Sequence, residues 1–311
     1  MPSKNDDIMT ACITGTVAKA ADRYAMDVMG LKSLTLMETA SSKIADYVMR
    51  HYPLRGGDFR HSEESMTVSG VDANDSERPE KAETKGRGPK ISALCGVGNN
   101  GADGICASRM LLEEGYQPHV YIVGSLEKAS WELLYQLCRF QQAGGAVTMY
   151  RPDIDMVKAD ETAGMAVHPN GDTAVDDAAD EAAVMAVRPD SNTVTDDAPP
   201  FQTNRLPDDD ILIDGIFGIG LHREIAGDYR TFIEEANRRR HGFVLAIDAP
   251  SGINTDTGAL MGCGIKADVT ITFGRNKTGL VCGAGRELAG RVLVEDIGIP
   301  DEAYIEAEAH A

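Results

Sequence analysis

The sequence predicts an α/β protein, a three-layer α/β/α Rossmann-like sandwich with a mainly parallel sheet. Three observations lead to this prediction. Short apolar runs alternate along the chain with longer segments of helical periodicity. The short runs are apolar almost throughout, as expected of strands covered by helices on both faces. Gly-rich loops follow four of these runs, which places a ligand crevice at the carboxyl ends of the strands.

The predicted elements follow one another in a regular order. Two helical segments come first, at 16–30 and 33–50, and the apolar residues of the second recur on one helical face. Strands are then predicted at 90–95, 119–123, 146–150, 210–218, 243–250, 267–274 and 290–298. Further helices are predicted at 103–114, 129–143 and 228–240. This alternation is typical of a doubly wound sheet.

Two stretches lack the composition of a packed domain. Residues 55–88 are polar, charged and Gly-rich, and residues 155–207 contain a tandem repeat that begins at Met165 and again at Met185. The repeat has so few large apolar residues that it cannot bury enough apolar surface to offset the conformational entropy lost on ordering. We therefore predict a single domain over 1–311 that carries two flexible insertions. An acidic interaction segment is the alternative interpretation of these insertions.

The charge balance limits the possible partners. The formal net charge is -19, so we expect the surface to repel nucleic acids and anionic lipids. The one tight basic cluster, Arg238–His241, is predicted at a helix C-terminus, where the helix dipole favours cations. The six cysteines show no zinc-like spacing, and no signal peptide or membrane-spanning run is present. These features predict a soluble cytoplasmic protein with free thiols.

The loop after the first predicted strand, CGVGNNGADG at 95–104, contains the G-x-G-x-x-G spacing of dinucleotide-binding loops. However, the second strand ends without the acidic residue that binds the ribose in dehydrogenases, and the Gly-Lys-Ser/Thr of a P-loop is absent. The glycines allow a tight turn, and Asn99 and Asn100 offer amide groups to a ligand. Asp103 is predicted at the helix start, as an N-cap, a ligand contact or both.

Carboxylates follow two further predicted strands. Asp214 and Asp248 each end an apolar run, so we expect both to point into the crevice, where desolvation favours acid–base or metal-binding roles. Together with Asn100 and the hydroxyl of Ser251, they form an oxygen-only set that suits a hard cation better than zinc. The alternative is that each aspartate only caps its loop.

Several motifs, in this order and spacing, resemble the NAD(P)H-hydrate epimerase family, the YjeF N-terminal domain. They are GLKSLTLMETA, GVGNNGADG, DGIFGIGL, AIDAPSGINTDTG and ADVTITFGRNKTGL...GRELAGRVLVEDIGIP. The resemblance implies a usually dimeric domain that interconverts the R and S epimers of NADHX and NADPHX, which are nicotinamide dinucleotides hydrated at the ring. It also implies one K⁺ per subunit. No dehydratase domain follows the final motif, so we expect a stand-alone form that feeds a separate dehydratase; the alternative is a dehydratase encoded in a part of the gene outside this sequence.

The resemblance also assigns roles to individual residues. It implies that Asp248 is the general acid/base, with Lys277 as a helper for charge on the ring or phosphate. A solvated loop lysine is the alternative for Lys277. The implied metal ligands are Asn100, Asp214 and Ser251. The implied substrate-binding residues are Asn99, Asn100, Gly101, Ala102, Asp103, Gly218, Ile219, Gly220, Leu221, His222, Arg223, Glu224 and Asp248.

The sequence departs from the family pattern at four of these positions. Ala102 replaces a glycine, Ile219 lacks a hydroxyl, His222 replaces a serine and Glu224 replaces a proline. Three of these departures fall in the loop that would clamp the substrate phosphates, where Arg223 is retained and could bind a phosphate.

The resemblance implies inversion at the hydroxyl-bearing ring carbon. Loss of water gives a cationic ring, and water returns from the other face without any redox change. The alternative function is a non-catalytic nucleotide-binding or scaffold module of the same fold. Retention of both Asp214 and Asp248 favours the enzyme.

Overall fold

The computed structural model describes residues 12–54, 88–152, 202–203 and 205–310. Within these residues, eight parallel strands form one sheet in the order β4-β3-β2-β1-β5-β6-β7-β8. The strands are β1 (Ile91–Cys95), β2 (Pro118–Ile122), β3 (Ala146–Tyr150), β4 (Gln202–Thr203), β5 (Ile211–Gly215), β6 (Val244–Ile247), β7 (Val269–Phe273) and β8 (Arg291–Glu295). The predicted Rossmann-like fold is confirmed.

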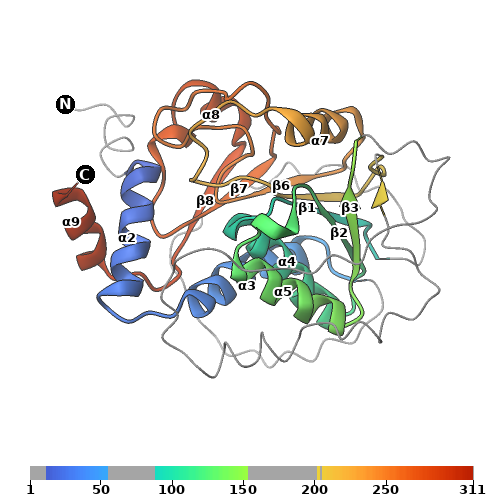
Figure 1. Ribbon diagram of the computed structural model, residues 1–311, viewed down its shortest axis with the longest axis horizontal. Coiled ribbons are helices and arrows are strands. Elements are labelled where there is room, and N and C mark those ends of the chain that lie inside the picture. The colour runs from blue at the N-terminus through green and yellow to red at the C-terminus, as the bar shows by residue number, and fades with distance from the viewer. Residues whose placement is uncertain (1–11, 55–87, 153–201, 204, 311) are drawn as a thin grey trace, which may run out of the picture.

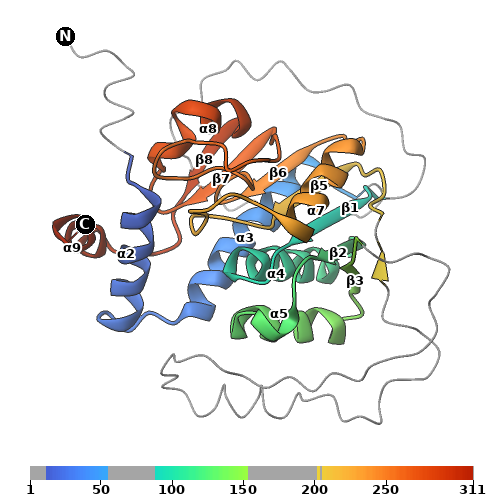
Figure 2. The same cartoon turned by 45° about the horizontal axis from the view of Figure 1, so that its top comes forward.

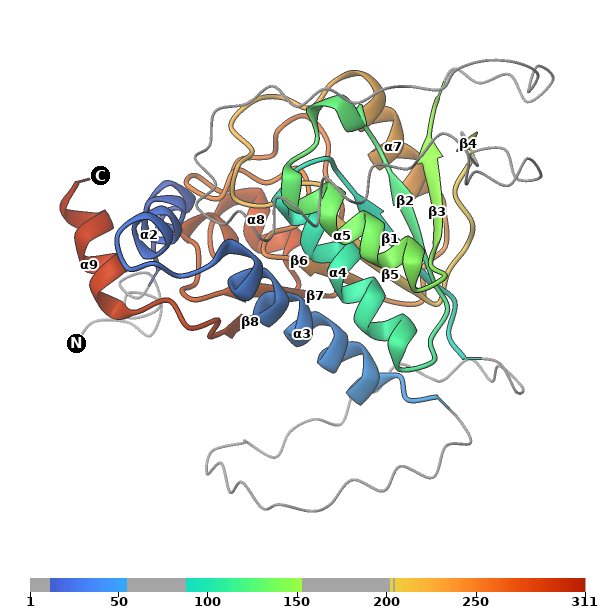
Figure 3. The same ribbon diagram turned by 60° about the horizontal axis from the view of Figure 1, so that its bottom comes forward.

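Helices cover both faces of the sheet. Helices α3, α4 and α5 lie on one face, and α7 and α8 lie on the other (Figure 1; Figure 3). Helices α2 and α9 lie side by side at one end of the molecule (Figure 2). No helix in the described ranges is long and apolar enough to cross a membrane. The bounds are α2 (Gly15–Asp27), α3 (Ser33–His51), α4 (Asn99–Glu113), α5 (Trp131–Gln142), α7 (Gly227–Arg238), α8 (Gly283–Leu288) and α9 (Asp301–Ala309), with 3-10 turns η1 (Leu126–Lys128) and η2 (Thr278–Leu280).

The apolar strands form the centre of the core. Every residue of β1 and β5 is buried. One apolar cluster fills the space between the sheet and α3, α4 and α5, and a second lies between the sheet and α7. The basic cluster lies at the C-terminus of α7, as predicted, and Arg238 and Arg239 both pair with Glu235. The core therefore accounts for the nearly continuous apolar runs of the sequence.

The position of β1 and β5 determines where a ligand can bind. The strands β2, β3 and β4 extend the sheet on one side of β1, whereas β6, β7 and β8 extend it on the far side of β5. The chain therefore reverses its direction of travel across the sheet between β1 and β5. In doubly wound sheets, the ligand crevice lies at this switch point, outside the carboxyl ends of the strands.

The structure corrects three of the predictions. Helix α4 begins at Asn99 with Gly98 as its N-cap, so Asp103 lies one turn inside the helix and is not an N-cap. The insertion predicted at 155–207 ends too late, because β4 pairs with β3 and Leu206 is buried. Helices α8 and α9 were not predicted. The insertion predicted at 55–88 lies outside the described residues, apart from its last one.

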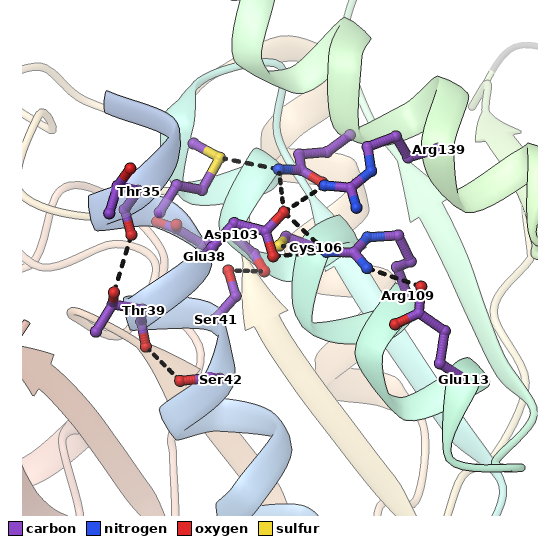
Figure 4. A network of polar contacts seen from close by, with 12 residues as sticks. Thr35, Glu38, Thr39, Ser41, Ser42, Asp103, Cys106, Arg109, Glu113 and Arg139 are labelled. Atoms are coloured by element: carbon purple, nitrogen blue, oxygen red, sulfur yellow. Dashed lines mark hydrogen bonds and ion pairs between the residues drawn. The ribbon is translucent and has the colours of Figure 1, made fainter. Parts of the chain in front are cut away.

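A polar network connects the three helices on one face of the sheet (Figure 4). Arg109 of α4, which is 5% exposed, donates to both carboxylate oxygens of Glu38 of α3 at 2.8 and 2.7 Å. Arg139 of α5 donates to the same carboxylate. Ser41 of α3 donates to the backbone carbonyl of Asp103 at 3.1 Å. These contacts fix the first turns of α4, which line the switch point, against α3.

Candidate functional site

A cavity of about 930 Å³ opens at the switch point. Its wall combines α2, the start of α4, the loop after β5, the loops after β6 and β7, and α9. Its lining contains the following predicted site residues: Asn99, Asn100, Asp103, Gly218, Ile219, Gly220, Leu221, Asp248 and Lys277. Segments that are distant in the sequence therefore meet at one cavity, but two of the predicted ion ligands, Asp214 and Ser251, are not part of its lining.

Asp248 is held in an unusual backbone conformation directly after β6. Its φ is 63°, in the left-handed region that Asp and Asn adopt more readily than most residues. Its Oδ1 accepts hydrogen bonds from Lys277 Nζ at 2.6 Å and from Thr272 Oγ1 at 3.0 Å. No described residue donates to Oδ2, and a Cβ built on Gly218 in the cavity wall would lie 3.4 Å from it. One oxygen is therefore anchored, while the other remains available to a ligand.

Lys277 is a buried partner of that carboxylate. The residue is only 2% exposed, so the interpretation as a solvated loop lysine is wrong. Besides Asp248, its ammonium donates to Thr272 Oγ1 at 2.8 Å and to the carbonyl of Phe273 at 2.9 Å. Three acceptors match its three protons. Lys277 therefore orients Asp248 and adds positive charge to the cavity wall.

Asp214 lies within β5 and is fully buried beneath the cavity. Ser251 donates to Oδ2 from its backbone N–H at 2.8 Å and to Oδ1 from its hydroxyl at 2.5 Å, and Ile216 N–H donates to Oδ1 at 3.3 Å. Asp214 therefore joins the loops after β5 and β6 and does not line the cavity, which corrects the prediction that it points into the crevice. Burial raises the pKa of Asp214 to about 6, against the lowering effect of these hydrogen bonds.

Asn100 lies in the first turn of α4 and faces the loop after β5. A Cβ built on Gly218 would approach Asn100 Oδ1 to 2.8 Å. The neighbouring Phe217 N–H donates to Ser251 Oγ at 2.9 Å. The amide oxygen of Asn100, the hydroxyl of Ser251 and the carboxylate of Asp248 thus lie around the short segment 217–218. Asn100 Nδ2 is buried and has no hydrogen-bond partner among the described residues, which is unusual for a buried polar atom.

Five predicted substrate-binding residues are not part of the cavity lining. Three of them, at the end of the predicted phosphate clamp, are exposed: His222, Arg223 and Glu224. Ala102 packs in the core. Gly101 is buried, and a Cβ there would collide with the carbonyl oxygen of Gly96. Gly101 therefore allows α4 to begin close to the preceding turn.

Residues from both ends of the described chain also line the cavity and were missed by the sequence reasoning. Asp22 of α2 and Tyr304 of α9 are the most notable. The sequence did carry a signal for Asp22, because helical periodicity places it on the same face as Ala18 and Ala25, both of which are buried. Burial raises the pKa of Asp22 to about 6, Asp248 adds to this effect and Lys277 opposes it.

Comparisons with known proteins agree with this architecture. A family model described as YjeF-related protein N-terminus matches residues 33–279. The NAD(P)H-hydrate epimerase of Limosilactobacillus fermentum is 32% identical over 286 residues, which cover 91% of this chain and 95% of that protein. The bifunctional NAD(P)H-hydrate repair enzyme Nnr of Salinibacter ruber is 30% identical over 93% of this chain and 41% of its own length. The crystal structure of yeast YNL200c shares the fold, with a TM-score of 0.57 at 17% identity over 95% of this chain and 93% of that one.

Proposed function

Because the chain belongs to the YjeF N-terminal family, we propose that it interconverts the R and S epimers of hydrated nicotinamide dinucleotides, NADHX and NADPHX. The observation that carries this proposal is the Asp248 carboxylate, which has one anchored oxygen and one oxygen open to the cavity. The relatives named as epimerases align with most of the chain, which supports the same conclusion.

Inversion requires the ring hydroxyl to leave as water and to return on the other face of the ring. A positioned carboxylate can transfer the proton in such a step and contributes roughly 10²–10⁴-fold to the rate. Asp248 is suited to this role because Lys277 and Thr272 fix its orientation. The ring only loses and regains water, so the electrons balance without a redox partner.

The dinucleotide would lie along the cavity at the switch point. Backbone N–H groups at the N-terminus of α4 are free to bind phosphate, since its N-cap, Gly98, offers no side chain. The Gly-rich loop 218–221 lies in the same wall and would approach the phosphates from the other side. We propose that the released epimer passes to a separate dehydratase and that the protein works as a cytoplasmic homodimer.

We further propose that Asn100, Asp214 and Ser251 hold K⁺. Their donor set of amide, carboxylate and hydroxyl oxygens fits a hard cation. No cluster of three or more His, Cys, Asp or Glu side chains suited to a metal occurs in the described part of the chain, so an ion here would have one carboxylate, that of Asp214, and otherwise neutral oxygens. The unpaired Asn100 Nδ2 is consistent with an amide whose oxygen is directed to a bound ion. The ion would place positive charge beside the substrate.

Potassium should stabilise the protein more above pH 6 than below it. The pKa of Asp214 is about 6 in the folded protein, against a usual value of 3.8, so the folded state holds the extra proton between these values. The free energy of unfolding therefore falls as the pH rises from 3.8 to about 6. Above about pH 6 the buried carboxylate is charged, and a bound cation then stabilises the folded state most. Thermal unfolding in KCl and in tetramethylammonium chloride, at about pH 5 and about pH 7.5, measures the difference. At about 100 times its Kd, K⁺ should add about 2.7 kcal/mol.

The Asp214→Asn variant is the control for this prediction. It lacks the ionisable group, so its response to K⁺ should be weak and the same at both pH values. A wild-type response that does not change with pH, or an undiminished response in the variant, would contradict the assigned ion site.

The epimerase activity itself can be tested in a coupled assay. Purified protein is mixed with (R)-NADHX and a dehydratase specific for the S epimer, and loss of the R form is followed over time. We expect the R form to disappear faster than in a reaction without the protein. Equal rates would favour the scaffold module over the enzyme.

A further inference from the structure

Helix α2 carries a carboxylate into the cavity and is itself docked on the loop that carries Asp248. Thr16 donates to Asp256 from its backbone N–H at 3.0 Å and from its hydroxyl at 2.7 Å. Gly15 packs so closely on Thr255 that a Cβ there would collide with the threonine hydroxyl. Both partners belong to the segment SGINTDTG that follows Asp248. The position of α2 is therefore fixed relative to the proposed catalytic aspartate.

The other side of α2 is covered by α9. Small residues of both helices, such as Ala21 and Ala303, are fully buried in one shared cluster. Tyr304 of α9 joins this cluster and lines the cavity. Asp22 thus projects from a helix that is held at its N-terminus and along its length, which gives its carboxylate a defined place in the cavity wall.

The Asp22 carboxyl differs from Asp248 in its surroundings. No described residue donates a hydrogen bond to Asp22 or forms an ion pair with it, whereas Asp248 has Lys277 at 2.6 Å. The charged and titratable groups that act on Asp22 are Asp248 and Lys277 from the loops after β6 and β7, Asp103 of α4 and Tyr304 of α9. Asp248 is ion-paired with Lys277, whereas burial without a paired cation favours the neutral acid at Asp22.

We propose that Asp22 is a second proton-transfer residue of the cavity, which acts with Asp248 on the ring hydroxyl in the epimerisation proposed above, on which this inference rests. In one direction, the Asp22 carboxylic acid gives its proton to the hydroxyl. The C–O bond breaks with its electron pair on oxygen, and water leaves a cationic ring. A water molecule then adds to the same carbon from the other face while Asp248 takes its proton. In the reverse direction, the two carboxyls exchange roles.

This division of labour follows a general pattern of acid–base sites. Two carboxyls in different environments can serve as acid and base in one reaction. An epimerase needs both functions, because one hydroxyl leaves and another arrives. A single carboxylate on one face would have to serve both faces of the ring. Asp22, from α2, and Asp248, from the loop after β6, reach the cavity from different elements, so two groups are available.

The test compares Asp22→Asn with Asp27→Asn on the same helix. Asp27 is exposed, pairs with Arg23 and does not line the cavity, so its variant should keep wild-type activity. We expect Asp22→Asn to lower kcat by roughly 10²–10⁴-fold with little change in KM. The wild-type kcat/KM for the R epimer should fall as the pH rises through about 6, where Asp22 loses its proton. This alkaline decline should disappear in Asp22→Asn.

A conservative variant separates chemistry from structure. Asp22→Glu keeps an ionisable group, so it should regain part of the lost activity and retain the alkaline decline. Thermal unfolding of each variant reports on the fold. Full activity of Asp22→Asn, or a loss of activity that leaves the pH profile unchanged, would overturn the inference but not the proposed function. Absence of epimerisation by the wild-type protein would overturn both.

Discussion

Asp248→Asn should lower kcat for NADHX epimerisation by roughly 10²–10⁴-fold and leave the fold intact. The amide can neither give a proton to the leaving hydroxyl nor take one from the incoming water, so the reaction loses its acid/base group. The fold should persist because Asn also tolerates the left-handed φ of 63° at this position. Its Oδ1 can still accept from Lys277 and Thr272. Steady-state kinetics measure the first effect, and thermal unfolding measures the second.

Asp228→Asn is a matched control for this variant. Asp228 lies in the first turn of α7, is exposed and does not line the cavity. We expect its variant to retain the wild-type kcat and KM. An Asp248→Asn protein that keeps full activity would remove Asp248 from the mechanism, whatever the control shows.

Lys277→Met should destabilise the protein by about 3 kcal/mol, the second large effect that we expect. The substitution removes the cation beside Asp248, a residue that is only 9% exposed, and it also deprives Thr272 Oγ1 and the Phe273 carbonyl of a donor. A largely buried charge that loses its counter-charge is costly, because Oδ1, the oxygen that Lys277 and Thr272 contact, faces protein and not water. Chemical denaturation measures the loss, and epimerase activity should fall as well, because Asp248 loses one of the two groups that orient it.

The double variant Lys277→Met with Asp248→Asn provides the control. Neutralising Asp248 removes the unpaired charge, so the double variant should recover much of the stability lost in Lys277→Met. The two effects should therefore be far from additive, as expected for residues in direct contact. An additive result, or a Lys277→Met protein as stable as the wild type, would contradict the assigned ion pair.

The sheet was largely predictable because its strands are buried on both faces. Each of the seven predicted strands overlaps an observed strand, and the predicted bounds of β3 match the observed ones. The strand β4 was missed because it has only two residues and depends on pairing with β3. The start of α4 was placed too late, since Asn-Asn-Gly is typical of turns, although here these residues form the first helical turn after Gly98.

The candidate site was predictable only where a motif ends a strand. Asp248 and Asn100 could be placed at the crevice because the carboxyl ends of β6 and β1 meet there. The environment of Lys277 could not, since its burial depends on contacts with Asp248 in another loop and with the end of the preceding strand. The exposure of Arg223 could not be predicted either, because a sequence motif does not determine which residues of a loop face away from the cavity.

The incorporation of solvent oxygen tests the central claim most directly. (R)-NADHX is incubated with the protein in ¹⁸O-labelled water, without a dehydratase, and both epimers are analysed by mass spectrometry. If the ring hydroxyl leaves and water returns in this cavity, the S epimer should carry ¹⁸O and form faster than in a protein-free reaction or with Asp248→Asn. Epimers that interconvert with their oxygen retained, or no faster than without the protein, would contradict the account.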